Sequence, residues 1–495
     1  MNAHHLTARA SAILLGAILL ASAAAAEGKL AIKAGKVIQG PGLPDIDKGV
    51  IVIENGRIAA IGTDVKVPWD AKVIDAPKLI AFPGFVEAHS SRGMDRPNEN
   101  VDPAPFLSVR DSIDPVNFYF EDSLRWGITT INIQQGNNCV VAGQGMVVRP
   151  VGITIDEMTV KTNSGIKLSA TPKFGMSAAT QAQSLRKAFG DLRRHLEQLV
   201  EEKKDGNDRA KREALFQGRD LEGENAKGRA MEGSAWKVAG LEMIPRGEID
   251  EKQAPLLALV EGKMAAFFYC GRPMDVHRAL EVARENGFLA RTTLVISPAC
   301  YKAADVIAEA GVPVVLENPV VYVESDPMTG AETEIFVPGE LKKKNVRFAL
   351  SSSNTTTESL WFQAAQCVGR GMTRNDAIAA VTTIPADMLG LGKQVGSLEV
   401  GKVGNVLLYS GEPLSVTSWV EKVVVDGNEV YDRSKDVRVK HLLEGKAPAG
   451  TQAMGGAGSA EKPVCCDGSD AAEHAKHLEE QEKKAKKDKG EGDDK

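Results

Sequence analysis

The chain has 495 residues, of which 43% are hydrophobic and 25% charged, and its formal net charge is -6 at pH 7. This composition is that of a soluble globular protein, and the length suits one large α/β domain with a smaller satellite domain. The acidic balance, without a basic stripe interleaved with aromatic residues, argues against nucleic-acid binding, so we expect no nucleic-acid partner.

The N-terminus has the pattern of a secretory signal. Histidines and an arginine precede an apolar run over residues 12–21, and Ala24-Ala25-Ala26 places small residues where signal peptidase cleaves. The run is shorter than the roughly 20 residues that cross a bilayer, which disfavours a membrane anchor. We therefore predict a cleaved signal peptide over residues 1–26, export to the periplasm or the extracellular space, and no membrane span in the mature chain.

Residues 27–80 alternate short apolar runs with turns, and residues 396–440 repeat this pattern. Asn55-Gly56 and Asp426-Gly427 each separate two β-rich runs, which favours a tight hairpin because both turn positions need positive φ. The sequence predicts that the two ends of the chain together build a small β-sandwich domain.

Residues 81–395 have the pattern of a (β/α)8 TIM-like barrel, because apolar runs of strand type alternate with helical patterns. The expected strands cover residues 127–133, 145–149, 265–269, 293–296, 312–316 and 346–350. The expected helices cover residues 276–286, 303–310 and 373–383, the last with a capping residue at Thr373. The predicted fold class is therefore α/β.

Two stretches differ from this pattern. Residues 177–230 predict a highly charged helical insertion, with interruptions at Gly206 and Gly218. Residues 446–495 are rich first in Gly, Ala and Pro and then in Lys, Glu and Asp, which predicts a disordered charged tail.

The six cysteines fall into two groups. Four stand alone among apolar or small residues, which predicts buried free thiols: Cys139, Cys270, Cys300 and Cys367. Cys465-Cys466 are adjacent in the polar tail, where metal binding, pairing between chains and no role at all stay open.

Three segments together resemble a known family. Ala81-Phe-Pro-Gly-Phe-Val-Glu-Ala-His89-Ser-Ser91 predicts a turn and a short strand that ends on a histidine. The run from Gly371-Met-Thr to Leu391 and the following Gly396-Ser-Leu-Glu-Val-Gly-Lys are similar to the C-terminal signature of the amidohydrolase superfamily. Val141-Ala-Gly-Gln-Gly-Met also resembles its imidazolonepropionase-related subgroup. The resemblance covers about residues 30–435.

The resemblance implies hydrolysis of carbon-nitrogen bonds other than peptide bonds, of the cyclic amide type. One or two divalent ions at the barrel mouth would lower the pKa of a bound water, and an Asp would act on its proton. Positions where the family carries ligand histidines or the catalytic Asp are occupied here by non-ligating residues: Ser91, Tyr269, Gly271, Pro298 and Ser353. Only His89, and Lys167 as a stand-in, are left as metal-ligand candidates. We predict no cofactor, and zinc or another divalent metal only if the protein is an active hydrolase.

These observations leave two alternative functions. The first is an exported pseudoenzyme with a degenerate metal site, whose barrel mouth binds a small molecule or a partner. The second is an active hydrolase with an unconventional site. No catalytic residue is assigned; His89 is the candidate, against a structural role at a strand end. The mouth candidates are His89, Arg92, Tyr269, Arg272, Ser351, Ser353 and Asn354. The two arginines among them favour an anionic ligand, and the resemblance implies a homo-oligomer.

Overall fold

The computed structural model describes residues 28–216, 244, 246–352 and 359–445. The chain divides into two compact units, residues 1–436 and 437–495. The predicted signal peptide, the whole predicted tail with Cys465-Cys466, and the mouth candidates Ser353 and Asn354 lie outside the described residues. Of the helices in the described part, none is both long and apolar enough to cross a membrane.

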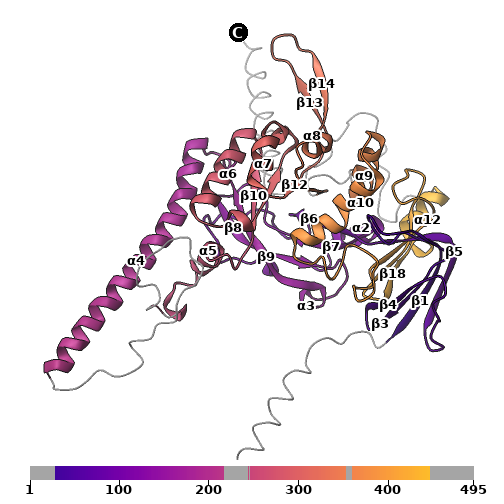
Figure 1. The fold of residues 1–495 in the computed structure, drawn as a ribbon, viewed down its shortest axis with the longest axis horizontal. Helices are drawn as coiled ribbons and strands as arrows, with labels where there is room; N and C mark the ends of the chain where they lie inside the picture. The colour runs from indigo at the N-terminus through magenta and orange to yellow at the C-terminus, as the bar shows by residue number, and fades with distance from the viewer. Residues whose placement is uncertain (1–27, 217–243, 245, 353–358, 446–495) are drawn as a thin grey trace, which may run out of the picture. The chain divides into compact units, whose positions relative to one another are not determined.

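Eight strands of the first unit form a nearly closed barrel sheet in the order β15-β12-β11-β10-β9-β8-β7-β6 (Figure 1). Their bounds are β6 Phe85–Ser90, β7 Ile128–Ile133, β8 Val141–Val148, β9 Thr159–Ser169, β10 Ala266–Cys270, β11 Thr292–Ile296, β12 Val314–Leu316 and β15 Phe348–Leu350. Ser351 Oγ donates to the His89 carbonyl at 2.8 Å, which links the last strand to the first. The predicted barrel fold is confirmed.

One strand of the barrel runs against the others. Neighbouring strands pair in parallel except at β8, which is antiparallel to both β7 and β9. The apolar runs of these strands are almost continuous because both faces of the sheet are covered; every residue of β7 and β11 is buried. A strand buried on both faces has the same pattern in either direction, so the sequence does not reveal the reversal of β8.

Helices surround this sheet. The α-helices of the first unit are α2 Phe118–Arg125, α3 Ile155–Met158, α4 Ala178–Phe216, α5 Ala254–Val260, α6 Pro273–Glu285, α7 Ala304–Ala310, α8 Val337–Lys343, α9 Leu360–Gly369, α10 Arg374–Val381 and α11 Thr383–Met388. Short 3-10 helices are η2 Val109–Asp111, η5 Arg246–Glu248, η6 Leu289–Arg291, η7 Pro298–Ala303 and η8 Arg433–Lys435. Thr373 caps α10 by accepting the backbone N–H of Asp376, as its sequence predicts.

The charged insertion differs from its prediction. Helix α4 has 39 residues and continues through Gly206, so the predicted interruption there is wrong; Gly218 lies outside the described residues. An exposed glycine costs a helix about 1 kcal/mol relative to alanine, which the helix-forming residues on both sides outweigh. The first half of α4 is anchored, because Leu185, Phe189 and Leu192 are buried and Phe189 stacks on Phe288 at 5.5 Å.

The two ends of the first unit share a second sheet of eight strands, in the order β18-β17-β16-β5-β1-β3-β4 with β2 beside β1 (Figure 1). Its strands are β1 Lys29–Val37, β2 Ile46–Asp47, β3 Val50–Glu54, β4 Arg57–Gly62, β5 Lys72–Pro83, β16 Val406–Tyr409, β17 Val420–Val425 and β18 Asn428–Asp432. Both predicted hairpin turns are confirmed, with φ of 51° and 76° at Asn55-Gly56 and 50° and 76° at Asp426-Gly427. The β-sandwich domain stays a prediction.

Strand β5 leads directly into β6 and so places His89. A Cβ on Gly84, between the two strands, would lie 2.1 Å from Thr129 Oγ1, so the turn there needs glycine. A small hairpin, β13 Val321–Ser325 and β14 Glu332–Phe336, projects from the barrel (Figure 1). In the second unit, α12 Val437–Glu444 has no buried residue.

The four isolated cysteines are buried free thiols, as predicted. Burial raises the pKa of Cys139, Cys300 and Cys367 to about 12, and it raises that of Cys270 well above the usual range. These thiols are therefore protonated at neutral pH and make poor nucleophiles.

Candidate functional site

Polar residues gather where the strands of the barrel end. His89, Lys167 and Tyr269 lie at the carboxyl ends of β6, β9 and β10, while Asn137 and Glu317 follow β7 and β12. The carboxyl ends of parallel strands meet at one edge of a barrel, where the active sites of TIM-like barrels lie. These five residues are called the mouth cluster below.

Lys167 is the centre of the mouth cluster. Its side chain is fully buried, and Nζ lies 2.7 Å from His89 Nε2 and 2.8 Å from Asn137 Oδ1. Asn137 in turn donates from Nδ2 to Glu317 Oε1 at 2.9 Å. Nζ also lies 5.5 Å from the centre of the Tyr269 ring. Within the described part of the chain, no carboxylate oxygen lies within 4 Å of Nζ. The hydrogen-bond partners of the buried amine are thus neutral, while the charge of Glu317 acts on it from beyond Asn137.

The electrostatics follow from this burial. Burial lowers the pKa of Lys167 to about 8, so its amine is still mostly protonated at pH 7. Burial, and next the charge of Lys167, hold the pKa of His89 well below its usual value, so the imidazole is neutral. Its Nε2 then accepts from the ammonium, which leaves the hydrogen on Nδ1. Among the described residues, His89 Nδ1 has no hydrogen-bond partner.

A buried carboxyl group holds the strand that carries His89. Glu87 accepts from the Ser352 backbone N–H at 3.0 Å and from the Ser352 hydroxyl at 2.5 Å. Burial raises the pKa of Glu87 to about 7, although the hydrogen bonds from Ser352 act against the shift. Together with the bond from Ser351 to His89, these contacts fix β6 against β15.

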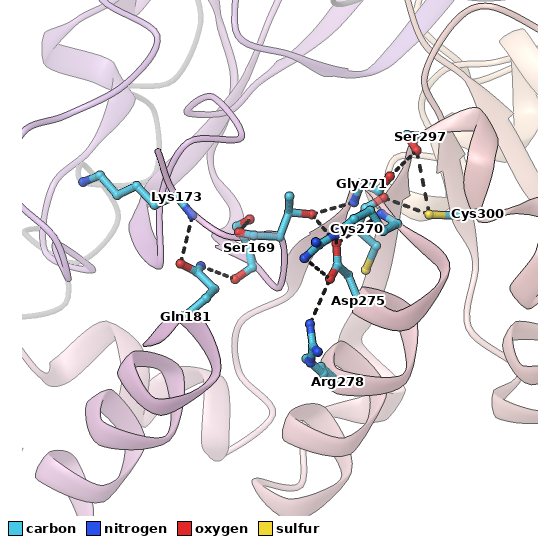
Figure 2. A network of polar contacts seen from close by, with 11 residues as sticks. Ser169, Lys173, Gln181, Cys270, Gly271, Asp275, Arg278, Ser297 and Cys300 are labelled. Atoms are coloured by element: carbon cyan, nitrogen blue, oxygen red, sulfur yellow. Dashed lines mark hydrogen bonds and ion pairs between the residues drawn. The ribbon is translucent and has the colours of Figure 1, made fainter. Parts of the chain in front are cut away.

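The two arginines predicted for the mouth have partners of their own. The Arg92 guanidinium lies 4.7 Å from the centre of the Tyr119 ring. Arg272 directly precedes helix α6, and its backbone and guanidinium donate to Asp275, whose side chain is fully buried. The Asp275 carboxylate also pairs with Arg278 (Figure 2). The Arg272 guanidinium is therefore already paired with the Asp275 carboxylate, which also accepts the backbone N–H at the start of α6.

The same network ties together the ends of β9, β10 and β11 (Figure 2). Thr171 donates to Asp275 Oδ2 at 2.9 Å and accepts from the Gly271 N–H at 2.6 Å. Ser297 donates to the Gly271 carbonyl at 2.7 Å. These contacts fix the strand that carries Lys167 relative to its neighbours.

The mouth cluster does not fit the metal that the family resemblance implies. Zinc in proteins takes about four ligands from His, Cys and carboxylates. In the described ranges, no three such residues gather closely enough to hold a metal ion. The one imidazole at the mouth directs Nε2 toward the Lys167 ammonium, 2.7 Å away. A second cation beside that ammonium would be repelled.

Sequence reasoning missed three residues of this region: Glu87, Asn137 and Glu317. Glu87 lies within β6 and Glu317 directly follows β12, so a polar residue in or next to an apolar strand was the available signal for these two. Asn137 lies in the connection between β7 and β8, where the sequence gives no such signal.

Known proteins resemble parts of this chain and its fold. Residues 355–431 match the model of the amidohydrolase family. The amidohydrolase tasK of Hapsidospora irregularis is 33% identical over 70 residues, which are 14% of this chain and 7% of that protein. A 5-methylthioadenosine/S-adenosylhomocysteine deaminase of Caldicellulosiruptor saccharolyticus is 40% identical over 68 residues, 13% of this chain and 16% of the deaminase. The matched segments thus span well under two thirds of either relative.

The fold gives a broader match. The crystal structure of an amidohydrolase from Thermotoga maritima MSB8 aligns with a TM-score of 0.62 and 25% sequence identity, over 82% of this chain and 100% of that chain. The family model, the sequence matches and the fold all relate this chain to the amidohydrolase superfamily.

Proposed function

We propose that this protein is an exported, non-hydrolytic member of the superfamily that binds a small anionic molecule at the mouth cluster. One observation carries the proposal: the buried Lys167 amine has two neutral hydrogen-bond partners and no carboxylate within 4 Å among the described residues. A buried charge is costly unless it is paired. An anionic group beside Nζ would supply the direct ion pair that the described part of the protein lacks.

A second donor in the same cluster indicates which chemical groups the ligand should carry. His89 Nδ1 is buried and has no partner in the described part of the chain, although hydrogen bonding at Nε2 leaves the proton on Nδ1. An unsatisfied buried donor costs about 1–3 kcal/mol. A ligand with one carboxylate and a second acceptor group would satisfy both Lys167 and His89. Small dicarboxylates have this chemistry.

The ligand must displace part of the protein to reach this site. Lys167 and His89 are 0% and 1% exposed, and Asn137, between β7 and β8, covers Nζ with its side-chain oxygen. Binding therefore requires Asn137 to move aside, and the released amide would exchange its bond to Lys167 for water. We expect slow association for this reason.

The alternative is a hydrolase or deaminase, as the names of the relatives suggest. Such a reaction needs a group that takes a proton from water near pH 7. Glu87, whose pKa burial raises to about 7, has a suitable pKa, but Ser352 and the backbone of His89 donate to its oxygens. The donor set at the mouth also does not fit a catalytic metal. Loss of hydrolysis is thus the better-supported interpretation.

Export, the β-sandwich domain, the kinship to the imidazolonepropionase subgroup and a homo-oligomer belong to the same proposal. Export rests on the apolar run over residues 12–21 and the small residues after it. The β-sandwich rests on the strands that both chain ends contribute to one sheet, through the pairing of β5 with β16.

Binding of malonate tests the proposal, with malonamide as its uncharged counterpart. We expect malonate, but not malonamide, to raise the melting temperature of the protein, because a ligand at 100 times its Kd stabilises the folded state by about 2.7 kcal/mol. Lys167→Met should abolish the shift. Lys161→Met is the matched control, since Lys161 lies on the same strand and its Nζ is bound to the Leu389 carbonyl. An equal shift in Lys167→Met would refute the proposal.

A further inference from the structure

A second cavity lies apart from the mouth, where α2, α9, β16 and β17 meet. Its volume is about 50 Å³, and it is lined by Arg125, Trp126, Trp361, Tyr409, Ser418, Trp419, Val420 and Arg433. Trp126 precedes β7 whereas Asn137 of the mouth cluster follows it, so the six residues of that strand separate the two sites by roughly 20 Å. The cavity is called the tryptophan cleft below.

Exposed indole rings form the walls of the tryptophan cleft. Three of the five tryptophans in the chain line it. Trp126 and Trp361 stack with ring centres 6.4 Å apart and planes inclined by 23°. Trp126 is 41% exposed and Trp419 is 49% exposed. Large apolar side chains that gather at a surface cavity mark a binding site, whereas single exposed ones do not.

The cleft also presents a cation without an acidic partner. The Arg433 guanidinium lies 5.2 Å from the centre of the Trp419 ring. Across the described residues, no carboxylate lies within 4 Å of it. Arg125, the other cation of the cleft, is bound by three carboxylates: Glu121, Asp122 and Asp436. Arg433 is therefore the group with free capacity for an anion, and its planar guanidinium suits a carboxylate.

Tyr409 adds a further unsatisfied group. Its side chain is 1% exposed and lines the cleft, and its hydroxyl has no hydrogen-bond partner among the described residues. A cavity of about 50 Å³ is larger than one water needs, about 10–15 Å³, but smaller than the roughly 150 Å³ that encloses a benzene ring. A ring bound here would therefore lie partly outside the cavity, against the exposed indole side chains of Trp126 and Trp419.

We propose that the tryptophan cleft binds a small single-ring aromatic carboxylate. The ring stacks on the indole side chains, and the carboxylate pairs with the Arg433 guanidinium. This site is independent of the mouth cluster and of the function proposed for it.

Benzoate is the probe, and benzyl alcohol and benzylamine, which carry the same ring without the negative charge, are its comparators. Binding to the full chain is measured by calorimetry and by saturation-transfer NMR. We expect benzoate to bind at least about tenfold more tightly than either comparator, and Arg433→Gln and Trp419→Ala each to weaken binding about tenfold or more. Arg433→Lys should retain part of the affinity, since it keeps the charge.

Two control variants separate the cleft from the general surface. Trp69→Ala removes a tryptophan that is 97% exposed and outside the cleft lining. Lys435→Gln removes a charge two residues from Arg433 that pairs with Asp432. Both should bind benzoate as the wild type does. No binding, equal affinity for the three compounds, or a loss of binding in Lys167→Met and not in Arg433→Gln would overturn the proposal, the last by assigning benzoate to the mouth cluster.

Discussion

The buried amine of Lys167 should make the stability of the protein depend on pH in a way that replacing this residue removes. In the folded chain the pKa of Lys167 is lowered from 10.5 to about 8. Between these two values the unfolded chain holds more protons than the folded chain, so the free energy of unfolding rises with pH. Below pH 8 the folded protein carries the full cost of the buried charge, and above pH 10.5 it carries none.

The magnitude follows from the shift. About 2.5 pKa units at about 1.4 kcal/mol each correspond to a destabilisation of about 3 kcal/mol at pH 7, which falls to about 1 kcal/mol at pH 10. Lys167→Met lacks the titrating group but leaves all others in place. The free energy of unfolding of the wild type, relative to that of this variant, should therefore rise by about 2.5 kcal/mol between pH 7 and pH 10.

Urea unfolding at pH 7, 8, 9 and 10, for wild type and variant in parallel, measures this difference. Groups that titrate alike in both chains cancel in the comparison. Lys161→Met is the control: burial lowers the pKa of Lys161 too, but its side chain is only partly buried, so the same sign with a smaller slope is expected. Parallel curves for wild type and Lys167→Met would show that the amine is not buried as a cation, and the reasoning on the mouth cluster would fail.

Three further predictions use the same unfolding assay. The free energy of unfolding of Glu87→Gln, relative to that of the wild type, should rise by up to about 3 kcal/mol as pH rises from 4.5 to above 7. Burial raises the Glu87 pKa to about 7, so the wild type loses stability through that range. A difference that stays constant with pH would contradict this. Asp275→Asn should destabilise by about 2–4 kcal/mol, because it leaves two guanidinium groups without their buried acceptor, whereas Asp191→Asn in an exposed ion pair should change stability by less than about 1 kcal/mol. Gly84→Ala should cost about 1–3 kcal/mol, since the new Cβ would lie 2.1 Å from Thr129 Oγ1, and an unchanged midpoint would mean that the turn adjusts freely.

Most features of the fold could be predicted from local sequence patterns. Both turns of the sheet that the chain ends share are set by pairs of residues that tolerate positive φ, and Thr373 caps its helix through a bond to a residue three positions on. Such features depend on neighbours in sequence, so they can be predicted. The direction of β8 depends instead on which strands flank it, and the continuity of α4 through Gly206 depends on the summed propensity of its whole length.

The candidate site was only partly predictable. His89 was named as the end of a strand and Lys167 only as a stand-in metal ligand. Their 2.7 Å contact joins positions 78 residues apart, which strand pattern alone does not show. Asn137 reaches Lys167 from a connection between strands, where the sequence gives no periodicity. Arg272 was predicted to face the mouth, but its backbone and guanidinium donate to Asp275, three residues later in helix α6.

The metal content of the purified chain tests the central claim most directly. The protein is prepared without chelator or affinity tag, incubated with zinc, dialysed and analysed by plasma mass spectrometry. We expect less than about a tenth of an ion per chain, because the mouth offers one imidazole beside a cation. About one ion or more per chain, lost in His89→Ala but retained when Cys465 and Cys466 are changed to serine, would contradict the claim and support an active hydrolase.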